Sequence, residues 1–153
     1  MMKNSNLPIN ILFAGFVAGT LDILAAIYLL AGGNAVGTFK FIASGAFGKA
    51  AFAGGNGMVI WGIVFHYAIA VSFTTVYFLL YPRLAFLKQN RWLNAAIYGI
   101  IVWSVMNLLV LPLSGISQSA FKWQEASLNI AILIICIGSP VSLLADRFYE
   151  KAG

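Results

Sequence analysis

Four long apolar runs, separated by shorter polar or glycine-rich stretches, set the pattern of this sequence. They cover residues 9–31, 58–81, 93–113 and 127–145. About 20 apolar residues in an α-helix are needed to cross a hydrocarbon core of roughly 30 Å. The pattern therefore predicts an all-α membrane protein, in which residues 1–153 form a single domain built as a four-transmembrane-helix bundle.

The first run and two prolines refine this prediction. The first run is too long for the apolar region of a signal peptide and contains Asp22, so we expect a retained membrane helix. Pro112 lies at the end of the third run, where the missing N–H costs little. Pro140 lies inside the fourth run, and we expect it to kink this helix. The nearby hydroxyls of Ser139 and Ser142 would then satisfy the freed backbone groups.

The loop between the first and second runs, residues 32–57, contains eight glycines but is too apolar for an ordinary solvated loop. Six of its apolar residues recur at helical spacing and predict a short helix: Phe39, Ile42, Ala46, Phe47, Ala50 and Ala53. Two placements fit this helix. It is either an amphipathic helix on the outer membrane surface, or a lid-like segment that caps the bundle from the extracytoplasmic side.

The composition supports a membrane protein. Hydrophobic residues make up 61% of the chain and charged residues only 8%, whereas a soluble domain carries about a quarter charged residues. The chain could not cover itself against water, so the lipid bilayer is its expected partner. The formal net charge of +5 comes from basic residues scattered over the loops without a stripe or cluster. We therefore expect no nucleic acid partner.

The residues that commonly carry metal or covalent chemistry are sparse. Cys136 is the one cysteine and lies in an apolar run, so it has no partner for an intramolecular disulfide. His66 is the one histidine, and a single histidine with a distant cysteine does not make a zinc site. The sequence contains no nucleotide-binding glycine motif and no serine triad. It therefore predicts no cofactor, no metal and no catalytic residues.

The distribution of basic residues predicts the orientation of the helices. Four spans place both termini on one side, together with the loop between the second and third spans. That side carries six basic residues and the other side three: Lys3, Arg83, Lys88, Arg91, Arg147 and Lys151 against Lys40, Lys49 and Lys122. Under the positive-inside rule both termini are expected in the cytoplasm. Trp92 and Tyr81 on that side, with Trp61 and Trp123 on the other, are expected as interfacial anchors.

Strongly polar residues from different spans are predicted at one depth. Counted from the outer ends of the spans at 1.5 Å per residue, Asp22 lies roughly 13 Å, His66 about 12 Å and Asn107 about 9 Å below the surface. Asn129, near the start of the fourth span, lies somewhat higher. Because these levels differ by about one helical turn, we predict a ligand-binding or proton-relay site formed by these residues.

The same helix faces carry small residues. Three faces combine glycines with one polar residue each: Gly15 and Gly19 with Asp22, Gly62 with His66, and Gly99 with Asn107. Small residues let neighbouring helices approach closely, so these glycines are predicted to pack inside the bundle. Tyr67 follows His66 in the unusually polar second span and is a further ligand or relay candidate, on one wall of a cavity. Glu125 is expected only to start the fourth helix.

The carboxylate of Asp22 is costly in this position. Insertion of an aspartate at the centre of a membrane helix costs roughly 2.5 to 3.5 kcal/mol, whereas an interhelical hydrogen bond contributes about 0.6 to 2 kcal/mol. Two interpretations follow. Asp22 and His66 either share a proton and bind a polar group or relay protons, or they hydrogen-bond only to fix the register of their helices.

Three stretches resemble a known group of proteins: "FIASGAFGKAAFAGG", "HYAIAVSFTTVYFLLYPRL" and "YGIIVWSVMNLLVLPLSG". They are similar to small four-helix bacterial inner-membrane proteins of uncharacterised function, and more distantly to the YagU type. The positions that match the pattern are His66, Tyr77, Pro82, Gly99, Pro112 and Leu113. The resemblance implies a bacterial inner membrane and a four-helix bundle. It brings no catalytic or binding residue with it, and the first helix with Asp22 differs from the YagU type.

Three functions fit these observations. The first is a membrane protein that binds a small molecule or lipid, or relays protons, at the layer of Asp22 and His66. The second is a structural or accessory protein that stabilises a homo-oligomer or another membrane protein through its small-residue helix faces. The third is an intramembrane enzyme acting on a lipid, but no second carboxylate or metal set accompanies the aspartate and histidine. We therefore expect binding rather than catalysis.

Overall fold

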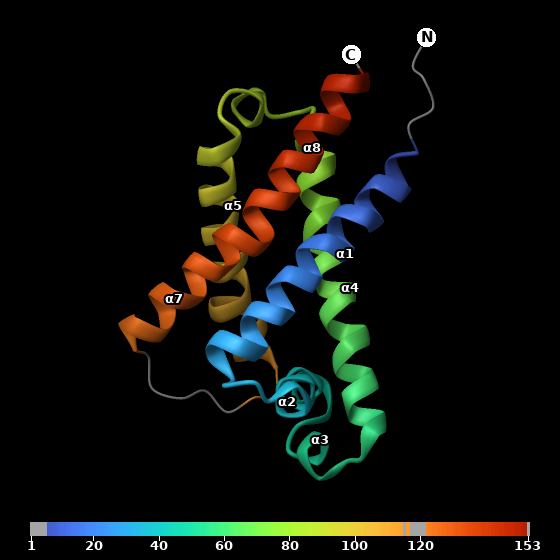
Figure 1. Cartoon of the computed structure of the whole chain (residues 1–153), viewed down its shortest axis with the longest axis vertical. Coiled ribbons are helices and arrows are strands. Elements are labelled where there is room, and N and C mark those ends of the chain that lie inside the picture. The colour runs from blue at the N-terminus through green and yellow to red at the C-terminus, as the bar shows by residue number, and fades with distance from the viewer. Residues whose placement is uncertain (1–5, 115, 117–121, 153) are drawn as a thin grey trace.

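The computed structural model describes residues 6–114, 116 and 122–152, and these ranges contain helices and turns but no strand (Figure 1). Four helices are long and apolar enough to cross a membrane: Leu7–Leu30, Asn56–Leu80, Arg91–Leu113 and Trp123–Glu150. An all-α protein with four candidate membrane-spanning helices is thereby confirmed. Lys3, which entered the orientation argument, lies outside the described residues, as does the side chain of Lys151.

Three of the four long helices are divided by a π-helical segment, in which the backbone bonds reach five residues back. In chain order the elements are α1 (Leu7–Ala25), the π segment η1 (Ala26–Leu30), α2 (Ala35–Phe47), α3 (Ala50–Ala53), α4 (Asn56–Leu80), the 3₁₀ turn η2 (Ala85–Lys88), α5 (Arg91–Val105), the π segment η3 (Met106–Val110), α6 (Leu111–Leu113), α7 (Trp123–Leu133), the π segment η4 (Ile134–Gly138) and α8 (Ser139–Ala152).

Two of the π segments directly precede the prolines. Pro140 follows η4, and the N–H of Ser139 bonds the carbonyl oxygen of Ile134, five residues back. The Ser139 hydroxyl also donates to that oxygen at 3.0 Å. Ser142, expected to serve the backbone around Pro140, instead donates to the carbonyl oxygen of Arg91 in the third long helix. Pro112 follows η3 in the same way. A proline ring clashes with the carbonyl four residues back in an α-helix, and the wider π turn makes room for it.

The fourth helix is longer than predicted. It runs over Trp123–Glu150, whereas the apolar pattern indicated 127–145. Its last turns are polar in sequence but remain helical because Phe148 and Tyr149 pack against Phe78 of α4, with ring centroids 6.0 and 6.3 Å apart. Tertiary packing therefore extends a helix beyond the point where its hydropathy falls.

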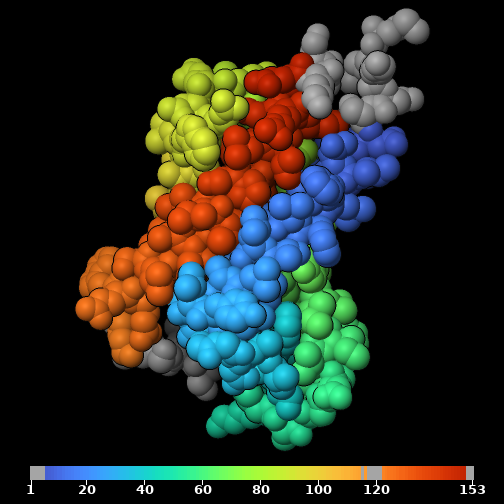
Figure 2. Space-filling view, viewed as in Figure 1, coloured from blue at the N-terminus to red at the C-terminus, as the bar shows by residue number. Residues whose placement is uncertain are grey.

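The densest packing lies in the half of the molecule that carries both termini. Figure 1 shows the two ends of the chain at the same end of the molecule, and Figure 2 shows α1 beside the helix formed by α7 and α8 on one face. In this half Ala14, Ala18, Phe78, Val141 and Ala145 are completely buried. The opposite end, where α2 and α3 lie, is packed more openly and holds the cavities described below.

Tyrosine hydroxyls link the helices of this core. Tyr77 of α4 donates to Ser142 at 3.1 Å, and Ser142 in turn donates to the carbonyl oxygen of Arg91 at 3.0 Å. Tyr81 donates to the buried carboxylate of Asp146. Tyr81 is only 4% exposed, so its expected role as an interfacial anchor is wrong. Its ring packs inside the bundle because α8 supplies an acceptor for its hydroxyl.

The Tyr77 hydroxyl bond can be tested by one substitution. Tyr77→Phe is expected to lower the free energy of unfolding by about 1 kcal/mol, because buried interhelical hydrogen bonds in membranes have values in that range. Tyr28→Phe is the matched control, since the Tyr28 side chain is 70% exposed, and it should change stability little. Unfolding by sodium dodecyl sulfate in mixed micelles measures both. If Tyr77→Phe and Tyr28→Phe change the free energy of unfolding equally, the Tyr77 hydrogen bond does not contribute measurably to stability.

Glycines bring helix backbones into contact at several points. A Cβ atom at Gly15 would lie 2.9 Å from the Val71 side chain, and one at Gly19 would lie 3.2 Å from the Tyr67 ring. These two glycines therefore form the contact between α1 and α4. A Cβ at Gly99 would lie 2.6 Å from the Cα of Ile134 in η4, so α5 packs on the fourth helix through this residue.

The helix α2 lies across the end of the bundle that is far from the termini (Figure 1) and packs on α4. A Cβ at Gly62 would lie 2.0 Å from the carbonyl oxygen of Phe39, so Gly62 receives the backbone of α2 and not another spanning helix. Ala43 and Ser44 are the buried residues of α2. The six residues predicted at helical spacing are divided between α2 and α3, and four of them, Ala46, Phe47, Ala50 and Ala53, are exposed. Exposed apolar residues fit either predicted placement, on the membrane surface or over the bundle.

Candidate functional site

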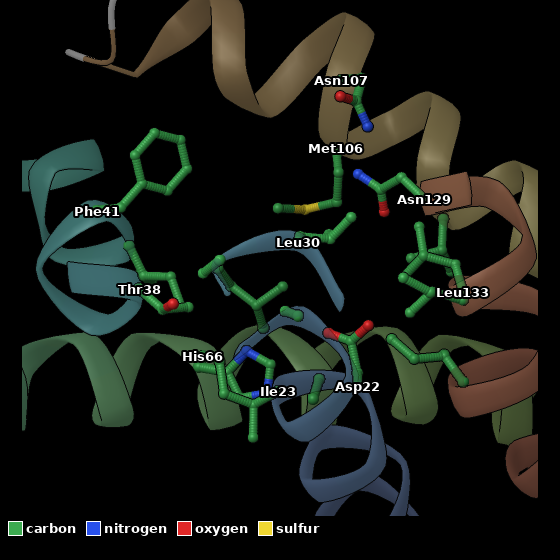
Figure 3. Close-up of a pocket in the computed structure, with 18 of the residues that line it drawn as sticks. Asp22, Ile23, Leu30, Thr38, Phe41, His66, Met106, Asn107, Asn129 and Leu133 are labelled. Carbon is green, nitrogen blue, oxygen red and sulfur yellow. The ribbon is translucent and has the colours of Figure 1, made fainter. Parts of the chain in front are cut away.

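A cavity of about 560 Å³ lies beneath α2, between all four spanning helices (Figure 3). Its walls come from the end of α1 with η1, from α2, from the middle of α4, from η3 and from α7 with η4. Most of the side chains that line it are apolar, including Ile23, Leu30, Phe41, Met106 and Leu133. The polar groups are few and come from different helices, which is the usual constitution of a ligand site.

Four of the residues singled out in the sequence line this one cavity: Asp22, His66, Asn107 and Asn129. Figure 3 shows the Asp22 carboxylate pointing into the cavity, with the His66 ring on the same side and the two asparagine amides across from them. The similar depths predicted for Asp22, His66 and Asn107 agree with this shared cavity, because the relevant ends of the first three helices lie within two residues of the predicted ones. These depths do not specify which of the side chains touch.

His66 is held by the backbone of the first helix. Its Nε2 lies 2.7 Å from the carbonyl oxygen of Gly19. A carbonyl oxygen can only accept, so Nε2 carries the proton of this bond, and in the neutral ring Nδ1 is left as an acceptor. The close contact of α1 and α4 at Gly19 brings the two groups together. The expected bond between His66 and Asp22 is not formed, because the histidine instead uses this carbonyl.

Asp22 is half-buried, and among the described residues its carboxylate interacts electrostatically with the His66 ring but forms no hydrogen bond or ion pair. The ion pair that the described residues form joins Lys122 to Glu125 at 2.8 Å and does not involve Asp22. No hydrogen bond donor of the described residues reaches the Asp22 carboxylate either. A carboxylate in an apolar surrounding is costly unless it is neutralised or bonded, so Asp22 is the group of this cavity that would gain most from a bound hydrogen-bond donor or cation.

The two asparagines contribute amide groups to the far wall. The Asn107 Nδ2 donates to the carbonyl oxygen of Trp103 at 2.9 Å, one turn back on its own helix. Its side-chain oxygen remains available as an acceptor on this wall. Asn129 of α7 is half-buried and points toward Asn107 in Figure 3. The two amides therefore offer hydrogen-bonding groups opposite Asp22.

Tyr67 lies elsewhere. Its hydroxyl pairs with the Thr20 hydroxyl at 2.9 Å, and its ring stacks on Phe16 with centroids 5.3 Å apart. It is not among the residues that line the cavity. Its place is the contact between α1 and α4, where its ring covers Gly19. The residue next to His66 in a helix points about 100° away from it, which explains why only one of the two faces the cavity.

Three further polar residues line the cavity and were not proposed as site residues: Asn34, Thr38 and Glu125. Asn34 accepts from the N–H of Gly37 at 2.8 Å and so begins α2. An asparagine ahead of an apolar helical run is an N-cap signal that could have indicated this end of the helix. Glu125, expected only to start the fourth helix, lies in its first turn and pairs with Lys122. Its hydrogen bond raises the pKa of the Lys122 ammonium.

All three π segments meet at this cavity. Residues of η1, η3 and η4 line it, represented by Ala26, Met106 and Ile137. Single π turns in otherwise regular helices occur frequently at functional sites, because they redirect side chains and free carbonyl groups. The convergence of three such turns on one cavity marks it as the candidate site of this molecule.

Comparisons with known proteins add no relative to this picture. No protein-family model, no curated protein and no solved structure matches the chain. In the described ranges no group of three His, Cys, Asp or Glu side chains is placed to hold a metal ion. The cavity and its side chains are therefore the features of this molecule that point to a function.

Proposed function

We propose that this integral membrane protein binds a small amphipathic molecule or lipid in the cavity beneath α2. The volume of about 560 Å³ lies within the usual range of small-molecule sites, about 300 to 1,000 Å³. The apolar walls would cover the hydrocarbon part of the molecule, and the side chains of Asp22 and His66 would orient its polar part.

The unpaired carboxylate of Asp22 is the observation that carries this proposal. Asp22 in its ionised form only accepts hydrogen bonds, and His66 with its Nε2 proton committed to Gly19 also presents an acceptor. A ligand that brings hydrogen-bond donors or a positive charge would satisfy both groups. A relay of protons would need Asp22 and His66 to be joined in a hydrogen-bonded chain, and the bond from His66 to Gly19 argues for binding instead.

The alternative, an accessory protein that assembles through its small-residue faces, has less support. The GxxxG face of the first helix, Gly15 and Gly19, is covered by α4 of the same chain. Gly62 is covered by α2, and Gly99 by the fourth helix. These faces are used within one molecule and are not free to receive a second copy or another protein.

We also propose the bacterial inner membrane as the location, with both termini in the cytoplasm. In Figure 1 the connection from α4 to α5 and the end of α8 lie at one end of the molecule, and α2, α3 and the start of α7 lie toward the other. The first group of segments carries Arg83, Lys88, Arg91 and Arg147, and the second carries or adjoins Lys40, Lys49 and Lys122. This distribution supports the orientation given by the positive-inside rule. The resemblance to small four-helix inner-membrane proteins supports the location. The cavity would then open toward the extracytoplasmic half of the bilayer.

Native mass spectrometry of the protein released gently from nanodiscs tests the binding proposal. The wild type is expected to carry a discrete bound mass, and Asp22→Asn is expected to lose it, because the amide keeps the shape of the side chain but removes its charge. Asp146→Asn is the matched control, since it removes the other membrane-embedded aspartate, which contacts Tyr81 far from the cavity. It should keep the bound mass while lowering thermal stability. Equal retention by wild type and Asp22→Asn would refute the proposed site.

A further inference from the structure

A second cavity of about 290 Å³ adjoins the first. It lies between α2, α4 and the end of the third spanning helix, and the hydroxyl of Ser114 is the polar side-chain group among the described residues that line it. Five side chains line both cavities: Phe41, Ile42, Ile69, Met106 and Leu111. The two spaces are therefore neighbours across a thin apolar boundary, one with polar groups and the other almost entirely apolar.

The second cavity reaches the outer surface of the bundle at a membrane-spanning level. Ala46 of α2 and Ala68 of α4 line it and are exposed. Around Ala68 the surface of α4 is apolar, with Val64 49% exposed, so bilayer hydrocarbon would cover this region. A hydrocarbon chain could pass from the bilayer into the cavity here without crossing a polar surface.

The charge of the first cavity is negative. Its lining includes the carboxylates of Asp22 and Glu125, and no lysine or arginine is among the described residues that line it. Glu125 is compensated by Lys122, whereas the half-buried Asp22 has only the His66 ring as an oppositely acting group among the described residues. In a medium of low dielectric a cation at hydrogen-bond distance would be strongly favoured by this carboxylate.

We propose that the two cavities together bind a single-chain amphiphile with a protonated amine head group. The ammonium lies at Asp22, on the side of the cavity that also carries the His66 ring, and the alkyl chain extends past Met106 into the second cavity. Met106 lines both cavities, and its flexible side chain, which points into the first (Figure 3), can adapt to a chain passing beside it. This inference rests on the proposed function and adds to it the chemical class of the ligand.

Simple amines of different chain length provide the test. Octylamine and butylamine are offered to the protein in nanodiscs at equal free concentrations, and the bound fraction is measured by native mass spectrometry. Octylamine is expected to bind about tenfold more tightly or better, because each additional buried methylene adds to the affinity. Octanol and octanoate have similar chains without the positive charge. They are expected to bind at least about tenfold more weakly than octylamine, since they lack the charge-assisted bond.

A substitution in the second cavity separates the chain from the head group. A Cβ at Gly45 would lie 3.7 Å from the Ile116 side chain, an ordinary contact, so Gly45→Leu fills the cavity without forcing the backbone apart. It is expected to abolish the preference for octylamine while leaving butylamine binding unchanged. Gly57→Leu is the matched control, because a Cβ at Gly57 meets nothing within 4 Å, and it should preserve the preference.

The outcomes distinguish this inference from the function on which it rests. If butylamine binds as tightly as octylamine, or if Gly45→Leu keeps the preference, the second cavity does not hold the chain and the inference is overturned. If octanol binds as tightly as octylamine, the amine head group is overturned. If no amine displaces a bound mass that depends on Asp22, the ligand class is wrong while the binding function stands. If the wild type also carries no bound mass that depends on Asp22, both this inference and the proposed binding function are overturned.

Discussion

Gly138→Ala is expected to destabilise the protein by about 3 kcal/mol, at the upper end of the usual cost of overpacking a core. A Cβ at Gly138 would lie 2.1 Å from the carbonyl oxygen of Ala95 and 2.9 Å from its carbonyl carbon. Both atoms belong to the backbone of α5, so no side chain can turn aside to make room. The two helices would have to separate along their contact, which includes the similar approach of Gly99 to Ile134.

Gly57→Ala is the control for this prediction. It adds the same methyl group to a helix of the same protein, where a Cβ meets nothing within 4 Å. Alanine is favoured over glycine inside a helix by about 0.5 to 1 kcal/mol, so this variant should be neutral or slightly more stable. Unfolding by sodium dodecyl sulfate in mixed micelles compares the two. A Gly138→Ala variant as stable as the control would show that α5 and η4 can move apart at little cost.

The number of candidate membrane-spanning helices and their approximate positions could be predicted from hydropathy, whereas the ends of the fourth helix could not. An apolar run of sufficient length has only one stable conformation in a bilayer, with its backbone groups bonded within the helix. The π segments could not be predicted in this way, since a bond to the fifth residue back leaves the apolar pattern unchanged. The prolines gave a local signal, because Pro112 and Pro140 each need room for their ring, but η1 ends in a turn without proline.

The depth of the site residues within the bundle could be predicted from the sequence, but their contacts could not. Counting residues from the helix ends places Asp22, His66, Asn107 and Asn129 around one space, since the rise per residue is constant. The partner of His66 depends on how closely α1 approaches α4, and that distance is determined by Gly19 and the Tyr67 ring. The burial of Tyr81 similarly depends on Asp146, which lies 65 residues away in the chain. Such pairings are properties of the packed bundle.

The helix α2 covers one side of the cavity, and its position depends on one glycine of α4. Gly62 of α4 is buried beneath α2, and a Cβ there would lie 2.0 Å from the Phe39 carbonyl oxygen and 2.9 Å from the Phe39 Cα. Thr38 and Phe41, on either side of this contact, line the cavity. Displacement of α2 would therefore open the space above Asp22 without disturbing the densely packed half of the bundle near the termini.

Gly62→Ala is accordingly expected to weaken the affinity of the cavity for its ligand by about tenfold. This corresponds to a loss of about 1.4 kcal/mol of binding free energy when α2 moves away from the ligand. The stability of the four-helix core should fall less than in Gly138→Ala, because α2 lies at the end of the bundle. Native mass spectrometry of the bound species and unfolding in mixed micelles measure the two quantities on one sample. Gly57→Ala, five residues earlier in the same helix, is the control for both. A Gly62→Ala variant that keeps full occupancy would show that the ligand is held by the spanning helices alone, and α2 would then have no part in binding.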